Sequence, residues 1–322
     1  MEAGRRGVVA FLFPGQGSQA VGMGKELAAL YPAAQHTFDE ADEALGFKLS
    51  QLCFEGPEDQ LKLTQNTQPA ILTVSVAAAR VLAEAGISTQ FAAGHSLGEY
   101  SAHVAAGTLE FADAVKTVRN RGRYMQEAVP VGQGAMAAIL GMELEPLKQI
   151  CDEATQGEVC EPANINSPGQ IVISGSTGAV QRAADLATSR GAKRAVMLPV
   201  SAPFHCALMQ PAQNRLEQDL RALTFNDPDF PVVANLDCDL VDTGDGARER
   251  LIRQVTGAVQ WERSMRLLID KGVETFVEVG PGKVLCGLMR QIDRSKLCLN
   301  VEDEASLQRV INQFSQHAST AE

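Results

Sequence analysis

The pattern of hydrophobic and polar positions predicts an α/β protein. Residues 8–13 form a continuously apolar, β-rich run, which is typical of a buried parallel strand. A sharp turn follows at residues 14–17, and helical spacing of apolar residues then continues to about Leu45. Thr67, Gln68 and Pro69 predict the start of a long helix, with Pro69 in its first turn, and Gly86 predicts its end.

A second pattern interrupts this α/β order between residues 134 and 199. Strands are predicted at residues 135–140, 161–165, 170–174 and 195–200, and helices at residues 145–155 and 179–190. The order βαββαβ is that of the split ferredoxin-like motif. We therefore predict a small ferredoxin-like subdomain over residues 131–200, inserted into a larger α/β subdomain made of residues 1–130 and 201–322.

The C-terminal third returns to α/β order. Strands are predicted at residues 231–235 and 275–279, with a helix at residues 261–271 between them. The tail from about Ser315 has the composition of a disordered segment.

Charge and hydropathy narrow the classes of function. The chain carries a formal charge of -11, which opposes nonspecific binding to nucleic acid or to an anionic membrane. An acidic partner must then dock on a local basic patch. The apolar run at residues 8–13 is too short for a signal peptide, and no other stretch is long enough to span a bilayer. These features predict a soluble, cytoplasmic protein.

The seven cysteines are scattered along the chain. None forms a C-x-x-C pair, and none has the histidine spacing of a zinc site. We expect reduced cysteines, as in cytosolic proteins, and no metal centre.

The segment Gly94–His95–Ser96–Leu97–Gly98 fits the nucleophile-elbow pattern G-x-S-x-G. A short strand is predicted before it at residues 91–93 and a helix after it at residues 99–106. This context would project the Ser96 hydroxyl at the carboxyl end of a strand, while the glycines keep Cβ atoms out of the turn. The alternative is a buried turn serine with no chemical role.

A nucleophilic serine needs a base, and His205 is the best candidate among five histidines. Pro203 and Phe204 precede it and predict a rigid loop. The others fit less well: His36 and His103 lie on predicted helices, His317 lies in the tail, and His95 sits on the tight turn, where we expect it to point away from Ser96 and pack.

The glycine loop after the first strand also fits a dinucleotide-binding fingerprint, Gly15-x-Gly17-x-x-Ala20. That function needs an acidic residue at the end of a second strand, but the available acids lie in a region with helical spacing. Oxyanion stabilisation is the better interpretation, with one backbone N–H from Leu97 and another from the turn at Gln16. An ordinary glycine turn is the alternative.

A set of motifs spread along the chain closely resembles the malonyl-CoA:acyl carrier protein transacylases, the acyltransferases of fatty acid synthesis and polyketide assembly lines. These motifs are FPGQGSQ at residues 13–19, GHSLGEY at 94–100, RGRYM at 121–125, GAM at 134–136, NINSPGQ at 164–170, APFH at 202–205, residues 254–261, and EVGPG at 278–282. The resemblance covers nearly the whole chain. It implies a hydrolase-like parallel-sheet core with a ferredoxin-like insert.

The resemblance also implies roles for individual residues. Ser96 would be the nucleophile and His205 the general base. The backbone N–H groups of Gln16 and Leu97 would form the oxyanion hole. Arg121 would bind the malonyl carboxylate as a bidentate pair, which lysine cannot reproduce geometrically.

Further positions follow from the same resemblance. The backbone carbonyl of Gln254 would orient His205 in place of a triad aspartate, and Met125, Asn164 and Phe204 would contact the substrate. Phe204 resembles the bulky residue of malonyl-selective members, although it can equally be a packing residue. The loop at residues 280–282 would lie nearby. Where the family often has Asn-Pro after Gln254, this chain has Gly257-Ala258, so the rigidity of that loop is a point for the structure to test.

The sequence thus predicts a ping-pong transfer of malonyl from coenzyme A to the phosphopantetheine thiol of an acyl carrier protein, with no cofactor beyond the thioester substrate. A serine esterase or thioesterase is the main alternative, and a non-catalytic carrier-binding protein is the other. The family suggests a monomer. Arg190, Lys193 and Arg194 are candidates for carrier docking, and a solvated charged face is the alternative.

Overall fold

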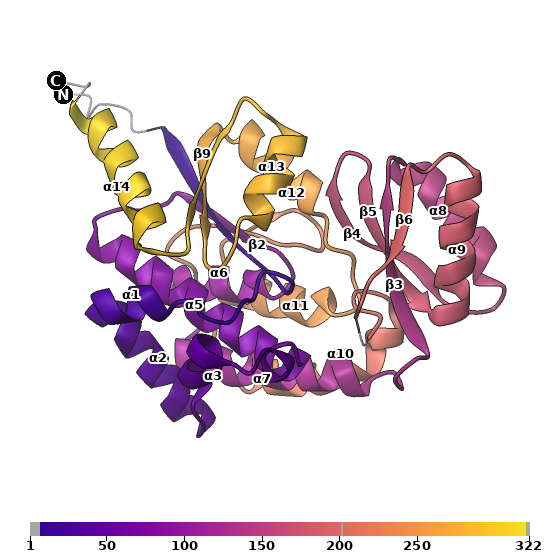
Figure 1. The fold of residues 1–322 in the computed structure, drawn as a ribbon, viewed down its shortest axis with the longest axis horizontal. Helices are drawn as coiled ribbons and strands as arrows, with labels where there is room; N and C mark the ends of the chain where they lie inside the picture. Colours follow the sequence, from indigo (N-terminus) through magenta and orange to yellow (C-terminus); the bar gives the residue numbers. More distant parts are fainter. Residues whose placement is uncertain (1–6, 201, 320–322) are drawn as a thin grey trace.

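Two separate sheets organise the molecule in a computed structural model, which describes residues 7–200 and 202–319 and side chains as far as residue 315 (Figure 1). The larger sheet has the strand order β10-β9-β1-β2-β7-β8. Its neighbours pair in parallel except for β7 and β8. The strands are β1 (Val8–Phe13), β2 (Phe91–Gly94), β7 (Val232–Val233), β8 (Leu240–Val241), β9 (Val273–Val279) and β10 (Leu297–Val301).

Both faces of the large sheet are covered, which explains the continuous apolar run of β1. Val9, Phe11 and Phe13 face one hydrophobic core, and the alternating Ala10 and Leu12 face another. The first core lies under α1 (Lys25–Leu30), α2 (Pro32–Leu45), α3 (Leu49–Glu55), α4 (Glu58–Leu61), α5 (Thr64–Glu84), α6 (Gly98–Ala105), α7 (Phe111–Glu127), α10 (Gln210–Arg221), α11 (Gly244–Gln254) and α14 (Glu304–Ser319). The second core is closed by α12 (Trp261–Asp270) and α13 (Val284–Ile292).

The smaller sheet is antiparallel and has the order β4-β5-β3-β6. Its strands are β3 (Gly134–Leu140), β4 (Cys160–Ser167), β5 (Gln170–Ser176) and β6 (Arg194–Met197), with α8 (Leu144–Thr155) and α9 (Thr177–Ser189) between them. Chain order and sheet order are those of a ferredoxin-like motif, so the predicted fold class is confirmed. The boundaries at residues 130 and 200 stay a prediction.

The two faces of the small sheet have different neighbours. One face packs on α8 and α9. The other carries Met136 and Val172 and packs against Leu198, Val200 and Phe204 on the segment that returns to the large sheet. The small sheet is also tied to the larger part by backbone bonds between β4 and Val259, with N···O distances of 2.9 and 2.8 Å. The small sheet is therefore joined to the larger part both by this packed segment and by these backbone bonds.

Four predicted elements differ from the observed ones. Helix α5 begins at Thr64, since the N–H groups of Asn66 and Thr67 close on the Leu63 carbonyl and place Pro69 inside the helix. Strand β6 ends at Met197, and the strand predicted at residues 231–235 shrinks to β7. Residues 315–319, predicted to be disordered, continue α14. Residues 320–322 lie outside the described residues. No described helix is long and apolar enough to cross a membrane.

Candidate active site

Ser96 sits on a tight turn between β2 and α6, as the elbow pattern predicts. Its φ angle of 52° is in the left-handed region, a strained backbone for a serine. The turn is that tight because Gly94 and Gly98 meet, and a Cβ atom on Gly98 would collide with the Phe13 carbonyl oxygen of β1. Asn235 holds the strained turn: its Oδ1 accepts from the Ser96 N–H at 2.7 Å, and its Nδ2 donates to the Gly94 carbonyl.

His205 lies against Ser96. Its Nε2 is 2.7 Å from the Ser96 Oγ, although 109 residues separate the two in the chain. The ring is buried, and its φ of 60° makes it a second strained position at the site. The chain thus brings the predicted serine and histidine within hydrogen-bond distance.

The other ring nitrogen of His205 faces two backbone carbonyls. Nδ1 is 3.0 Å from the Gln254 oxygen and 3.0 Å from the Gly257 oxygen. Carbonyls only accept, so Nδ1 carries the proton and Nε2 presents its lone pair to the Ser96 hydroxyl. Gly257, where this chain departs from the family pattern, supplies the second acceptor. Its position is tight, since a Cβ atom there would collide with the Leu236 side chain.

The environment of His205 keeps the imidazole neutral. Burial, and then the positive charge of Arg121, lower the pKa of His205 to about 3, despite the two carbonyl acceptors that favour the proton. The resting histidine is therefore a free base at neutral pH.

Arg121 projects from the buried face of α7 and is 1% exposed. Its Nη1 donates to the Gln68 Oε1 at 2.8 Å, and its Nη2 donates to the Gln254 Oε1 at 3.0 Å and to the Ser96 Oγ at 3.1 Å. No carboxylate of the described residues forms a salt bridge with it, and its Nε makes no hydrogen bond within them. A buried guanidinium whose hydrogen-bond partners are all neutral is a ready site for an anion.

A cavity of about 130 Å³ collects these groups. The lining side chains are those of Gln16, Gln68, His95, Ser96, Leu97, Arg121, Met125, Met136, Asn164, Leu198, Val200, Phe204 and His205. All predicted site residues line it except Gln254, which lies behind Arg121 and His205. The small sheet contributes Met136 and Asn164, so the cavity lies between the two sheets.

The predicted oxyanion donors line the cavity together with Ser96. Leu97 is the N-cap of α6, and its N–H lies at the free amino end of that helix. Gln16 lies on the turn after β1, which pairs in parallel with β2. Both turns therefore leave the sheet at the same edge, where they line the cavity.

Sequence reasoning missed several polar residues of the site. Gln68, Glu99 and Asn235 are buried and bond to Arg121, to Gln254 or to the Ser96 turn. His95, predicted to pack, lines the cavity, and its Nε2 lies 2.8 Å from the Asn166 Oδ1 of β4. His95 therefore connects the Ser96 turn to the small sheet.

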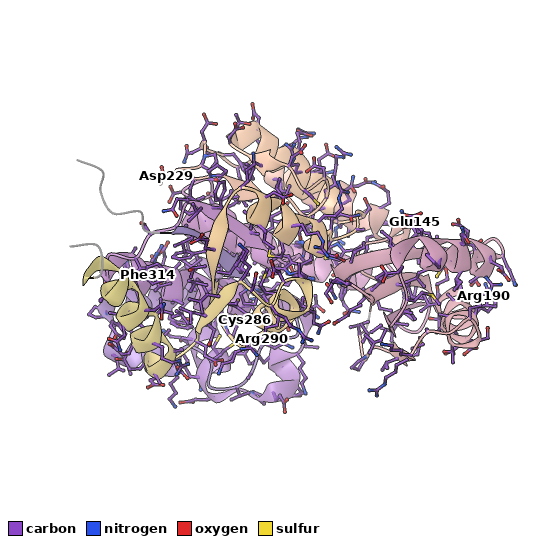
Figure 2. The ribbon with its side chains drawn as sticks, turned by 90° about the horizontal axis from the view of Figure 1, so that it is seen from above. Glu145, Arg190, Asp229, Cys286, Arg290 and Phe314 are labelled. Atoms are coloured by element: carbon purple, nitrogen blue, oxygen red, sulfur yellow. The ribbon has the colours of Figure 1, made fainter. Side chains whose placement is uncertain are left out.

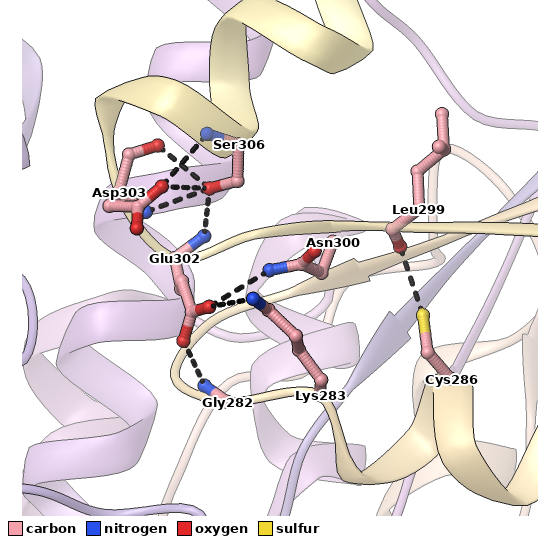
Figure 3. Close-up of polar contacts among 8 residues, drawn as sticks. All are labelled: Gly282, Lys283, Cys286, Leu299, Asn300, Glu302, Asp303 and Ser306. Carbon is pink, nitrogen blue, oxygen red and sulfur yellow. Dashed lines mark hydrogen bonds and ion pairs between the residues drawn. The ribbon is translucent and has the colours of Figure 1, made fainter.

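The loop at residues 280–282 does not line the cavity. Gly280 packs against Pro14 and Ser75, and Gly282 donates its N–H to Glu302 at 3.0 Å (Figure 3). Glu302 also pairs with Lys283 at 3.0 Å, while Ser306 and Asp303 cap the start of α14 beside it. The loop supports the turn at residues 14–18 from behind.

The candidate docking residues lie away from the cavity. Figure 2 places Arg190 at the outer end of the part of the molecule that carries the small sheet, where it pairs with Glu153 at 2.6 Å. The role of Arg190, Lys193 and Arg194 in docking stays a prediction. Among the described residues, no group of three or more histidine, cysteine, aspartate or glutamate side chains could hold a metal ion.

The chain is similar to known proteins over nearly its whole length. The acyl transferase domain model matches residues 10–321. The malonyl CoA-acyl carrier protein transacylase of Bacillus subtilis is 51% identical over 314 residues, covering 97% of this chain and 99% of the relative. The protein of the same name from Escherichia coli K12 is 52% identical over 284 residues, covering 88% of this chain and 92% of the relative.

Solved structures agree with this similarity. An acyl carrier protein S-malonyltransferase from Vibrio cholerae has a TM-score of 0.92 at 48% identity, covering 94% of this chain and 99% of that one. A malonyl-transacylase in complex with its type II PKS acyl-carrier protein has a TM-score of 0.93 at 44% identity, covering 95% of this chain and 99% of that one.

Proposed function

The chain belongs to the acyl transferase family, and from that premise we propose that it moves malonyl from coenzyme A to an acyl carrier protein through an ester on Ser96. The observation that carries the proposal is the buried Arg121 guanidinium, which has no carboxylate partner among the described residues and donates to the nucleophile at 3.1 Å. A malonyl group is short, so its carboxylate would stay near Ser96 and could pair with Arg121.

In the first step, the Ser96 Oγ attacks the thioester carbonyl and its proton passes to the His205 Nε2, 2.7 Å away. The N–H groups of Gln16 and Leu97 would stabilise the oxyanion. The carbon–sulfur bond then breaks, and coenzyme A leaves as a thiol with the proton from His205. The product is a malonyl ester of Ser96, with coenzyme A acting as part of the substrate and no resident cofactor.

In the second step, the phosphopantetheine thiol of the carrier protein gives its proton to His205 and attacks the ester carbonyl. The bond to the Ser96 Oγ breaks, and the hydroxyl recovers the proton from Nε2. The partner is assigned by analogy with the relatives, whose names specify an acyl carrier protein, and with the neighbour that was solved in complex with one.

The competing function is hydrolysis, with water as acceptor at the same serine. The two are separated by isolating the malonyl-enzyme and following its decay with and without a phosphopantetheine-loaded carrier protein. We expect slow decay in buffer and rapid transfer to the carrier thiol. Rapid hydrolysis that the carrier does not accelerate would instead identify a thioesterase.

Phe204 is expected to select against substituted malonyl groups. It is half-buried beside His205 and lines the cavity with Met136 and Val200. Phe204→Ala should raise acylation by methylmalonyl-CoA relative to malonyl-CoA by about tenfold, since one extra methylene in an apolar pocket is worth roughly 1–3 kcal/mol. Competition between the two thioesters, read by intact mass, measures the ratio.

Phe54 provides a matched control for this change, because it packs against Phe38 in the large core and does not line the cavity. Phe54→Ala should leave the methylmalonyl preference unchanged. An unchanged ratio in Phe204→Ala would mean that Phe204 only packs.

A further inference from the structure

We infer that Glu99 is a positioning residue of the site. It accepts a hydrogen bond from the side-chain amide of Gln254 and so orients that amide, and through Gln254 it positions Arg121 to bind an acidic acyl group. The inference rests on the proposed function. Glu99 lies on the first turn of α6, three residues after the nucleophile, and its side chain is fully buried. It does not line the cavity, so any effect on the reaction must pass through other groups.

The first link is between Glu99 and Gln254. The Glu99 Oε2 accepts from the Gln254 Nε2 at 2.8 Å and from the Asn235 N–H at 3.0 Å. The same Nε2 donates to the Ser96 carbonyl at 2.9 Å. Two acceptors therefore converge on the amide nitrogen of Gln254, and both would oppose an amide oxygen in its place.

The second link is between Gln254 and Arg121. With its nitrogen directed at Glu99, the Gln254 side chain must direct its Oε1 at the Arg121 Nη2, 3.0 Å away. An amide in the reversed orientation would set an N–H against the guanidinium. Glu99, together with the Ser96 carbonyl, thus determines which atom of Gln254 faces Arg121. The other terminal nitrogen of Arg121, Nη1, donates to Gln68 at 2.8 Å.

The third link reaches the nucleophile and the base. Asn235 donates its backbone N–H to the Glu99 carboxylate, and its side chain holds the strained Ser96 turn. The Gln254 backbone carbonyl accepts from the His205 Nδ1. A single residue, Asn235 or Gln254, therefore connects Glu99 to each of Ser96, His205 and Arg121. Loss of the Glu99 acceptor oxygen should disturb Arg121 most directly, because only the contact between Gln254 and Arg121 depends on the orientation of the Gln254 side-chain amide.

The role depends on the acceptor oxygen and not on the charge. The Glu99 Oε1 has no hydrogen-bond partner within the described residues, so a proton can reside there while Oε2 keeps both bonds. Burial raises the pKa of Glu99 to about 7, so both forms are present near neutral pH. Arg121 is the cation that faces it, and Asp237 is the nearby acid. Glutamine at position 99 should therefore serve nearly as well as glutamate.

The test compares acylation rates with malonyl-CoA and acetyl-CoA, read by intact mass after rapid quenching. Glu99→Leu should lower the malonyl-to-acetyl rate ratio by about tenfold or more, the scale of a hydrogen bond to a charged group. Glu99→Gln should keep the ratio within about threefold of wild type. Gln254→Ala keeps the backbone carbonyl for His205 and should lower the ratio like Glu99→Leu. In that background Glu99→Leu should add little.

Glu278 offers a matched control. It is a second fully buried glutamate, and burial raises its pKa to about 7, as for Glu99. Its carboxylate, however, accepts from the N–H groups of Leu285 and Cys286 at the start of α13. Glu278→Leu should reduce thermal stability without changing the malonyl-to-acetyl ratio. If Glu99→Leu does not fold, Glu99→Asp replaces it, since the shorter side chain keeps the charge but withdraws the acceptor from Gln254.

The outcomes separate the inference from the function on which it rests. Wild-type protein without a malonyl preference would contradict the proposed function. A wild-type preference that survives in folded Glu99→Leu, or in Glu99→Asp, would overturn the positioning role. A loss in Glu99→Gln as large as in Glu99→Leu would also overturn it, because charge would then be what matters.

Discussion

Replacing His205 with alanine is expected to slow acylation of Ser96 by malonyl-CoA by about 10⁴-fold or more, the scale found when one member of a serine–histidine pair is removed. The Nε2 of His205 is the acceptor at 2.7 Å from the Ser96 hydroxyl, and Nδ1 is committed to the carbonyls of Gln254 and Gly257. Rapid-quench intact mass, with malonyl-CoA in excess, measures the rate of ester formation.

His103 is the matched control for this variant. It is fully buried, and burial lowers its pKa to about 3, as for His205, but its ring faces Thr108 and does not line the cavity. His103→Ala should acylate at nearly the wild-type rate if it folds. A His205→Ala enzyme that forms the ester within about tenfold of wild type would remove the histidine from the mechanism.

The pH dependence of acylation provides a second view of the same base. A histidine works as a base only when unprotonated, and the pKa of His205 is lowered to about 3 by burial and by Arg121. Acylation should therefore stay nearly constant as the pH falls from about 8 to about 5, where an unperturbed histidine of pKa about 6.5 would already have lost most of its activity.

Replacing Arg121 with alanine is expected to lower acylation by malonyl-CoA by about 10²-fold to 10³-fold and to affect acetyl-CoA far less. The malonyl carboxylate would otherwise enter a buried pocket without a counter-charge, whereas acetyl has no charge to compensate. Removal of the positive charge should also raise the pKa of His205. The loss of acetyl transfer at low pH should therefore begin at a higher pH than in wild type. Parallel acylation rates with the two thioesters test both effects.

Arg119 is the control on the same helix. It stacks on Phe47 at 4.1 Å and does not line the cavity, so Arg119→Ala should preserve the malonyl preference. Equal losses for malonyl and acetyl in Arg121→Ala would contradict its role in binding the carboxylate.

Local patterns in the sequence were enough to predict the elbow and the small sheet. The turn around Ser96 needs a strand, two glycines and a helix within a few residues, and all of these are adjacent in the chain. The ferredoxin-like unit is likewise a contiguous stretch with alternating strands and helices. Signals of this kind are local, so a single sequence contains them.

The supporting polar network was not predictable in the same way. The side chains of Gln68, Glu99, Asn235 and Gln254 come from four distant places in the chain, and each is polar, so composition alone would place it on the surface. Gln254 was predicted only for its backbone carbonyl. Their burial is favourable only because they satisfy one another and Arg121 after folding. Nor did the pattern identify α7 as a helix, although it carries Arg121 and Met125 on one buried face.

The predicted ends of two strands were also wrong, again because of tertiary contacts. The strand predicted at residues 231–235 is cut short because the Ala234 N–H turns to Asp239 and the Asn235 N–H turns to Glu99. The segment after β6 leaves the small sheet to line the cavity with Leu198 and Val200. In both places the backbone leaves a sheet to build the site.

The most direct test of the central claim is the intact mass of the protein after a brief incubation with malonyl-CoA, for wild type and Ser96→Ala, with acetyl-CoA in parallel. The account predicts one malonyl adduct on wild type, none on Ser96→Ala, and little acetyl adduct on either. A malonyl adduct that persists in Ser96→Ala, or equal labelling of wild type by both thioesters, would contradict it.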